Sequence, residues 1–143
     1  MTGVQTCALP IYEEEPLAPG TVYLAPANYH LLVERSGVLE LSVDPPVNFA
    51  RPSVDVLFES AAEAFGRQLI GIILTGAGHD GSRGLLQIRQ AGGLVIVQDP
   101  ADAEMDSMPR KALELLAPDY LVSLPELPAL LCRLTHNPSG GPR

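Results

Sequence analysis

Residues 69–99 read LIGIILTGAGHDGSRGLLQIRQAGGLVIVQD, and they contain two apolar runs separated by a glycine-rich loop and a helical segment. The apolar runs are residues 69–74 and 94–97, and neither alternates with polar residues. Continuous apolar runs of this length are typical of strands that are buried on both faces of a parallel sheet. Residues 82–91 predict a helix that ends at Gly92 and Gly93. The stretch therefore predicts a β-loop-α-β unit of an α/β fold.

The flanking sequence predicts further strands and helices. Apolar residues recur at helical spacing from Pro52 to Phe65, and Ser123 and Glu126 have the spacing of a capping box. The other expected elements are a strand at 21–25, a hairpin of 30–35 and 38–43 with a turn at 36–37, a helix at 107–116, a strand at 119–122 and a final helix after 123. We expect an α/β fold: a three-layer, doubly wound, mostly parallel sheet with a β-hairpin insertion.

Composition narrows the class of protein. The chain has 143 residues, of which 46% are hydrophobic and 18% charged, as expected for one domain with a sizeable core. A net charge of −8 argues against a nucleic-acid partner, which requires a basic face. No apolar run approaches the roughly 20 residues that span a bilayer, so we expect no membrane insertion. Cys7 and Cys132 have no metal-ligand spacing and predict reduced thiols in a cytoplasmic protein.

The two ends of the chain differ from its middle. Residues 1–12, MTGVQTCALPIY, lack periodicity and resemble a translated adapter remnant, so we exclude them from the fold as a non-native leader. We expect the domain to span residues 13–135. Residues 136–143 predict a disordered tail.

The glycine-rich loop has a first interpretation as a dinucleotide site. Residues 76–81, GAGHDG, match G-x-G-x-x-G between a strand and a helix, and Asp99 follows Gly81 by 18 residues. Two observations count against it. The carboxylate of Asp80 would compete with a pyrophosphate at the helix N-terminus. Only 44 residues follow Asp99, too few to complete a dinucleotide fold downstream.

A second interpretation makes Asp80 a catalytic acid. Ligands in parallel α/β sheets bind at the carboxyl ends of the strands, where this loop lies. A carboxylate near a helix N-terminus stays ionised, and it can orient a histidine and stabilise the imidazolium form. We expect this carboxylate to lie near the amides of the helix that starts at residue 81 or 82, with a lowered pKa and one oxygen facing solvent. The amides of the loop are candidates for an oxyanion hole.

Five stretches resemble the catalytic domain of the chemotaxis protein-glutamate methylesterases, the CheB type. They are PGTVYLAP with His30 after it, PPVNFARPSVDVLFESAA, GIILTGAGHDGSRGL, AGGLVIVQDP and SMPRKAL, and together they cover about residues 15 to 135. The resemblance implies hydrolysis of glutamate methyl esters on chemoreceptors, with deamidation of some glutamines. The partners it implies are methyl-accepting chemotaxis receptors. This chemistry requires no cofactor and no metal.

The resemblance also implies roles for the loop. Asp80 corresponds to the aspartate of a Ser-His-Asp triad, and the amide of Ala77 to an oxyanion-hole donor within the loop of Thr75, Gly76, Ala77 and Gly78. The family usually has Met at the position of Ala77. The family's nucleophilic Ser and its His precede the matched stretches, and we find neither here. We therefore expect the C-terminal part of an incomplete domain, inactive alone, with a possible receiver domain upstream.

Two alternatives remain open from the residues themselves. His79, Asp80 and Ser82 are neighbours in sequence, but a triad needs side chains that converge from different segments. The chain could also be a non-catalytic fragment that binds partners in a signalling protein.

Overall fold

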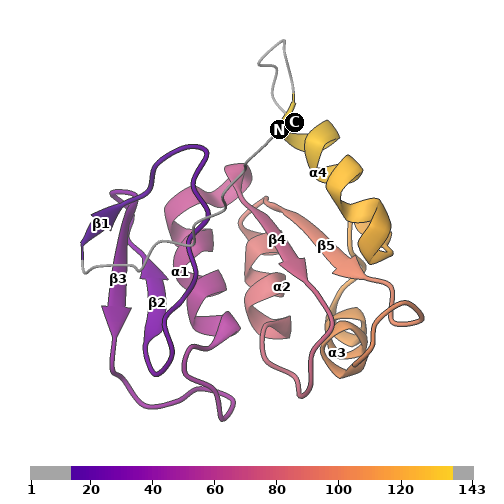
Figure 1. The fold of residues 1–143 in the computed structure, drawn as a ribbon, viewed down its shortest axis with the longest axis horizontal. Helices are drawn as coiled ribbons and strands as arrows, with labels where there is room; N and C mark the ends of the chain where they lie inside the picture. Colours follow the sequence, from indigo (N-terminus) through magenta and orange to yellow (C-terminus); the bar gives the residue numbers. More distant parts are fainter. Residues whose placement is uncertain (1–13, 137–143) are drawn as a thin grey trace, which may run out of the picture.

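The computed structural model describes residues 14–136, so the expected leader and residues 137–143 of the expected tail lie outside the described residues. Figure 1 shows the arrangement of the elements. They are β1 (Glu15–Pro16), β2 (His30–Val33), β3 (Val38–Ser42), α1 (Val54–Phe65), the 3-10 turn η1 (Gly66–Gln68), β4 (Ile70–Ile73), α2 (Ser82–Gln90), β5 (Leu94–Gln98), α3 (Ser107–Leu115), β6 (Tyr120–Val122), the 3-10 turn η2 (Leu124–Glu126) and α4 (Leu127–Thr135).

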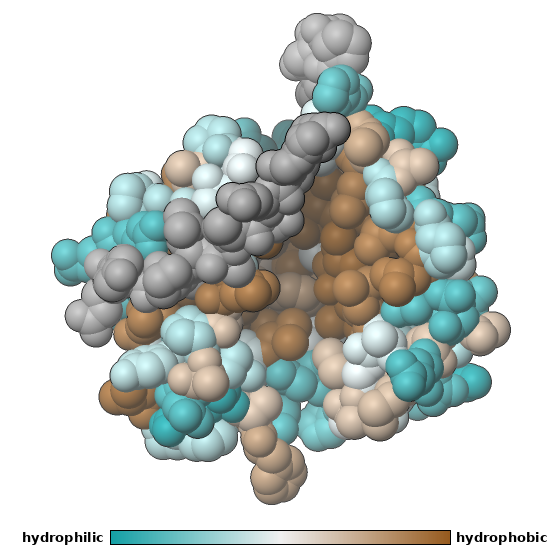
Figure 2. Space-filling model, in the orientation of Figure 1, coloured by the Kyte–Doolittle hydropathy of each residue, from teal (hydrophilic) through white to brown (hydrophobic). Residues whose placement is uncertain are grey.

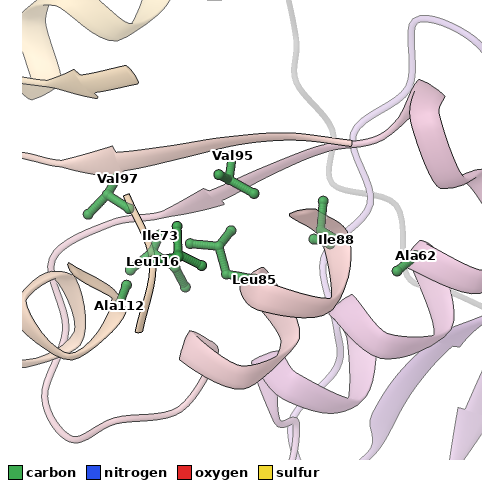
Figure 3. Packing of buried hydrophobic residues seen from close by; sticks show 8 residues of the cluster. All are labelled: Ala62, Ile73, Leu85, Ile88, Val95, Val97, Ala112 and Leu116. Atoms are coloured by element: carbon green, nitrogen blue, oxygen red, sulfur yellow. The ribbon is translucent and has the colours of Figure 1, made fainter. Parts of the chain in front are cut away.

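A parallel sheet of order β4-β5-β6 forms the centre, and helices pack against both of its faces. On one face, side chains of β4 and β5 pack against α2 and α3 (Figure 3). This cluster contains the buried residues Ala62, Ile73, Leu85, Ile88, Val95, Val97, Ala112 and Leu116. On the other face, Ile96 packs against Leu127 and Leu130 of α4. The expected three-layer α/β architecture with a parallel sheet is therefore confirmed.

The predicted hairpin is also confirmed, and it belongs to a separate antiparallel sheet of order β1-β3-β2. Leu31 and Leu39 of this sheet pack against Ala61 of α1. The opposite side of α1 lies against α2, where Gly84 lets the two helices approach closely: a Cβ on Gly84 would lie 2.6 Å from the Phe58 Cβ. Helix α1 thus joins the hairpin to the parallel sheet.

The expected strand at residues 21–25 is wrong, because only Tyr23 makes a β-bridge there. Tyr23 and Ala25 pack on the hairpin core without a hydrogen-bonded ladder. β-Propensity reports this kind of half-buried packing as readily as it reports a strand. Strand β1, which the sequence did not predict, has two residues and includes a proline, so it carries no periodicity. Within residues 14–136, no helix has the length and apolar character needed to cross a membrane.

Candidate active site

The loop between β4 and α2 lies at the carboxyl end of the parallel sheet, as predicted. It is anchored to the segment that leads into α3. The Thr75 N–H donates to Oε1 of the buried Gln98 at 2.8 Å, and the Gly76 N–H donates to the Met105 carbonyl at 2.9 Å. The Met108 N–H returns a bond to the Gly76 carbonyl at 3.1 Å. A Cβ at Gly76 would overlap the Met108 sulfur, so any larger residue there would displace the Met108 side chain.

These anchors divide the four expected oxyanion residues into two pairs. The amides of Thr75 and Gly76 are occupied and are not available to a substrate oxygen. Within the described part of the chain, the amides of Ala77 and Gly78 have no hydrogen-bond partner. Gly78 adopts a left-handed φ of 82°, and both residues are exposed. The free donors of the loop are therefore at its tip.

Asp80 is held by four hydrogen bonds from residues that precede it in the chain by 25 or more positions. Its Oδ1 accepts from Asn48 Nδ2 at 2.9 Å, from Ser53 Oγ at 2.8 Å and from the Asp55 N–H at 3.1 Å. Its Oδ2 accepts from the Val54 N–H at 2.6 Å. A carboxylate offers about four acceptor positions, two on each oxygen, so Oδ2 retains capacity for one more donor.

The environment of Asp80 favours the ionised carboxylate. Partial burial by itself raises the pKa of the Asp80 carboxyl, since it removes water from the charge. The hydrogen bonds from Asn48, Val54, Ser53 and Asp55 together outweigh burial and lower the pKa below its ordinary value. The expected direction of the pKa is confirmed. Asp80 is charged at neutral pH and stays half-exposed at the sheet edge.

The expected partners of Asp80 were wrong in one respect. We expected amides of α2, whereas Asp80 accepts the first-turn amides of α1. Helix α2 has another partner: Oδ1 of Asp55, a buried residue, accepts the Gly84 N–H at 2.7 Å. The expectation that one Asp80 oxygen meets only solvent is also wrong, because each oxygen accepts at least one protein hydrogen bond.

Sequence reasoning missed Asn48, Ser53 and Asp55 as parts of this site. Asn48 Nδ2 also donates to Asp55 Oδ2 at 2.7 Å, so one amide contacts both carboxylates. Behind them lies His30, which is 1% exposed; its Nε2 lies 2.9 Å from the Pro45 carbonyl and its Nδ1 accepts the Ser53 N–H at 3.2 Å. His30 therefore has a structural place. The sequence offered one signal for these residues: Ser53 and Asp55 stand at the start of a predicted helix, where residues of these types often accept or make hydrogen bonds.

The alternative triad of adjacent residues does not assemble. The Ser82 hydroxyl donates to the backbone carbonyl of His79 at 3.1 Å, and the His79 side chain is exposed.

The dinucleotide interpretation also meets obstacles. The Asp55 carboxylate occupies the α2 amide of Gly84, where a phosphate would bind, and Asp99 accepts the Ala101 N–H at 2.9 Å in a local turn. Among residues 14–136, no group of three or more His, Cys, Asp or Glu side chains could hold a metal ion.

A parallel α/β sheet with an ionised carboxylate and free loop amides at its carboxyl end is an arrangement found in hydrolases that use a catalytic triad. Comparison with known proteins then identifies the family. The family model described as CheB methylesterase matches residues 5–131, and the chain belongs to this family. The catalytic domain of Thermotoga maritima CheB methylesterase superimposes with a TM-score of 0.82 at 32% identity, over 87% of this chain and 67% of that one. The family does not support the dinucleotide interpretation.

The curated relatives have matching names. A Leptospira interrogans protein, whose name describes a protein-glutamate methylesterase/protein-glutamine glutaminase, is 50% identical over 125 residues, 87% of this chain and 65% of that protein. The protein-glutamate methylesterase FrzG of Myxococcus xanthus is 48% identical over 115 residues, 80% of this chain and 34% of that protein. The chain thus spans less than two thirds of the length of the curated relatives named here.

Proposed function

We propose that the chain is part of a protein-glutamate methylesterase that hydrolyses methyl esters on chemoreceptor glutamates and deamidates receptor glutamines. The observation that carries this proposal is the Asp80 carboxylate, ionised at the carboxyl end of β4 with acceptor capacity left on Oδ2. Family membership and the names of the relatives support the substrate class.

In the proposed reaction, Asp80 Oδ2 accepts the N–H of a catalytic histidine. That bond fixes the tautomer of the ring and stabilises the imidazolium that forms when the histidine takes a proton from a serine hydroxyl. The serine oxygen then attacks the ester carbonyl, and the Ala77 amide, with Gly78 beside it, donates to the developing oxyanion. Methanol leaves with the proton returned by the histidine, and water hydrolyses the acyl-enzyme. The serine and the histidine are proposed to lie upstream of the stretches that resemble the family.

Partners and location complete the proposal. The partners are methyl-accepting chemotaxis receptors, and a receiver domain upstream would link the enzyme to a phosphorelay. We place the protein in the cytoplasm, where cysteines such as the exposed, unpaired Cys132 stay reduced.

Methanol release from methylated receptor membranes tests the proposal in two arms. The 143-residue chain alone is expected to release none. In a longer gene product that includes the upstream serine and histidine, Asp80→Asn is expected to lower kcat roughly 10⁴-fold, as loss of a triad aspartate does. If the chain alone releases methanol, and a substitution within it abolishes that release, the proposal that the serine and the histidine lie upstream would be contradicted. An Asp80→Asn variant with full activity would show that Asp80 has no catalytic role.

A further inference from the structure

We propose that Asn48 is a positioning residue: its side-chain amide fixes the direction of the Asp80 carboxylate by bonding it and Asp55 together. The proposal rests on the proposed function only for the catalytic meaning of Asp80. The contacts themselves belong to the structure. Asn48 Nδ2 donates to Asp80 Oδ1 at 2.9 Å and to Asp55 Oδ2 at 2.7 Å.

The chemistry of the amide suits this task. A side-chain amide nitrogen carries two hydrogens in a fixed plane, so one residue can donate to two carboxylates at once. Both acceptors here are ionisable side chains that cap helices: Asp80 accepts amides at the start of α1, and Asp55 accepts an amide at the start of α2. Asn48 thereby bonds the two caps to each other.

The backbone around Asn48 is shaped to present it. The Val47 N–H donates to the Ala50 carbonyl at 3.0 Å and the Ala50 N–H donates back at 2.9 Å, which closes a tight turn. Its two central residues, Asn48 and Phe49, have left-handed φ values of 53° and 63°. Turns of this kind favour Asn and Gly at these positions, and a left-handed phenylalanine is strained. Phe49 is 101% exposed, so its own packing does not offset the strain, and the side chain of this turn that makes contacts with the site is Asn48.

The groups around Asp80 show what a bridging donor does here. Asp55 on α1 is a second acidic residue, and the carboxyl groups of Asp55 and Asp80 lie within hydrogen-bond reach of one nitrogen. Carboxylate oxygens accept hydrogen bonds and do not donate them, so a donor between the two groups is what can hold them together. On the side of β2, His30 reaches Asp80 only through Ser53. Within the described residues, no lysine or arginine bonds to Asp80. The neutral amide of Asn48 is the side chain that joins the pair.

Two glycine substitutions in the same turn test the proposal. Asn48→Gly removes the amide, Phe49→Gly keeps it, and each relieves a left-handed φ. The pKa of Asp80 is measured by carboxyl-carbon NMR titration of the chain. We expect a higher pKa in Asn48→Gly and an unchanged pKa in Phe49→Gly. Equal changes in both variants, or no change in either, would overturn the proposal.

A second measurement at pH 7 avoids acid conditions. Hydrogen exchange of the Val54 and Asp55 amides is expected to be about tenfold faster in Asn48→Gly, since a hydrogen bond to a charged group is weakened, and near wild type in Phe49→Gly. If Asn48→Gly does not fold, Asn48→Asp preserves the side-chain shape and adds a third carboxylate. A pKa of Asp80 that stays at the wild-type value in Asn48→Asp would overturn the proposal as well. These readouts follow the folded chain, so they are independent of methanol release.

Discussion

Asp80 caps α1, the helix that carries Asp55, and Asp55 caps α2, the helix that follows Asp80. Asp80, in the loop before α2, accepts the Asp55 N–H in the first turn of α1 at 3.1 Å. Asp55 in turn accepts the N–H of Gly84 in the first turn of α2 at 2.7 Å. The starts of α1 and α2 are therefore joined by acidic side chains of the candidate site, so a substitution at either residue is expected to affect the stability of both helix starts.

Asp80→Asn is expected to lower the free energy of unfolding of the chain by about 2 kcal/mol, since it removes a charged cap with four donors. An asparagine at this position would also place its NH₂ group, which only donates, against neighbours that are themselves donors. Urea denaturation measures the difference. The matched control is Asp106→Asn, which removes an exposed ion pair to Arg110 and is expected to change little. Equal losses in both variants would show that Asp80 is no more than a surface acid.

The stabilising effect of Asp80 is expected to depend on pH in a set direction. Its pKa is lowered in the folded chain, so its contribution is complete above the unfolded pKa of about 3.9 and is lost as the pH falls through the folded value. The difference in unfolding free energy between wild type and Asp80→Asn should therefore shrink below about pH 4. Asp102 and Glu126 also have lowered pKa values, but both are present in either protein and cancel in the difference. A difference that grows on acidification would contradict the prediction.

Gly81→Ala is expected to destabilise the chain by about 3 kcal/mol, from backbone strain and overpacking together. Gly81 has a φ of 97°, and a Cβ there would lie 2.5 Å from Ile73 Cδ1 and 2.9 Å from Val54 Cγ1. Gly37→Ala is the matched control, because Gly37 has a φ of 84° with nothing near its missing Cβ. Thermal unfolding of both variants separates steric overlap from strain. Similar losses in the two would rule out the packing argument.

The sequence predicted the fold best where burial alone determines it. Residues 69–74 and 94–97 are apolar on both faces, and they form β4 and β5 between α2, α3 and α4. The spacing of Ser123 and Glu126 also predicted the capping box correctly, since the Ser123 N–H donates to Glu126 Oε1 at 3.2 Å. Both signals are local or depend only on hydrophobicity.

The details of the site could not be predicted because they depend on contacts between distant segments. The position of Asp80 after a buried strand was predictable, but its donors lie in the segment from 48 to 55. No local pattern says that the loop before α2 reaches the start of α1. Asn48 lies in a turn with a phenylalanine where glycine is usual, so its left-handed geometry was not visible in the sequence.

The chain alone is expected to self-associate through the face of β4. Figure 2 shows a hydrophobic hollow over β4 and β5 between α1 and α4. Within the described residues β4 pairs only with β5, which leaves its other edge open, and Ile70 and Ile72 are only partly buried. Open strand edges and apolar surface promote association.

Light scattering tests this expectation on the wild-type chain and two variants. Ile72→Thr makes the partly buried face of β4 more polar and should reduce the mean particle size. Leu115→Thr, at an apolar residue of α3 that is 44% exposed, should leave the size unchanged, because it lies on a different element. The comparison separates association through β4 from nonspecific association through other exposed apolar residues. A monodisperse wild-type monomer with a cooperative melt would show that the open edge of β4 is tolerated in water and that the chain is stable without a partner there.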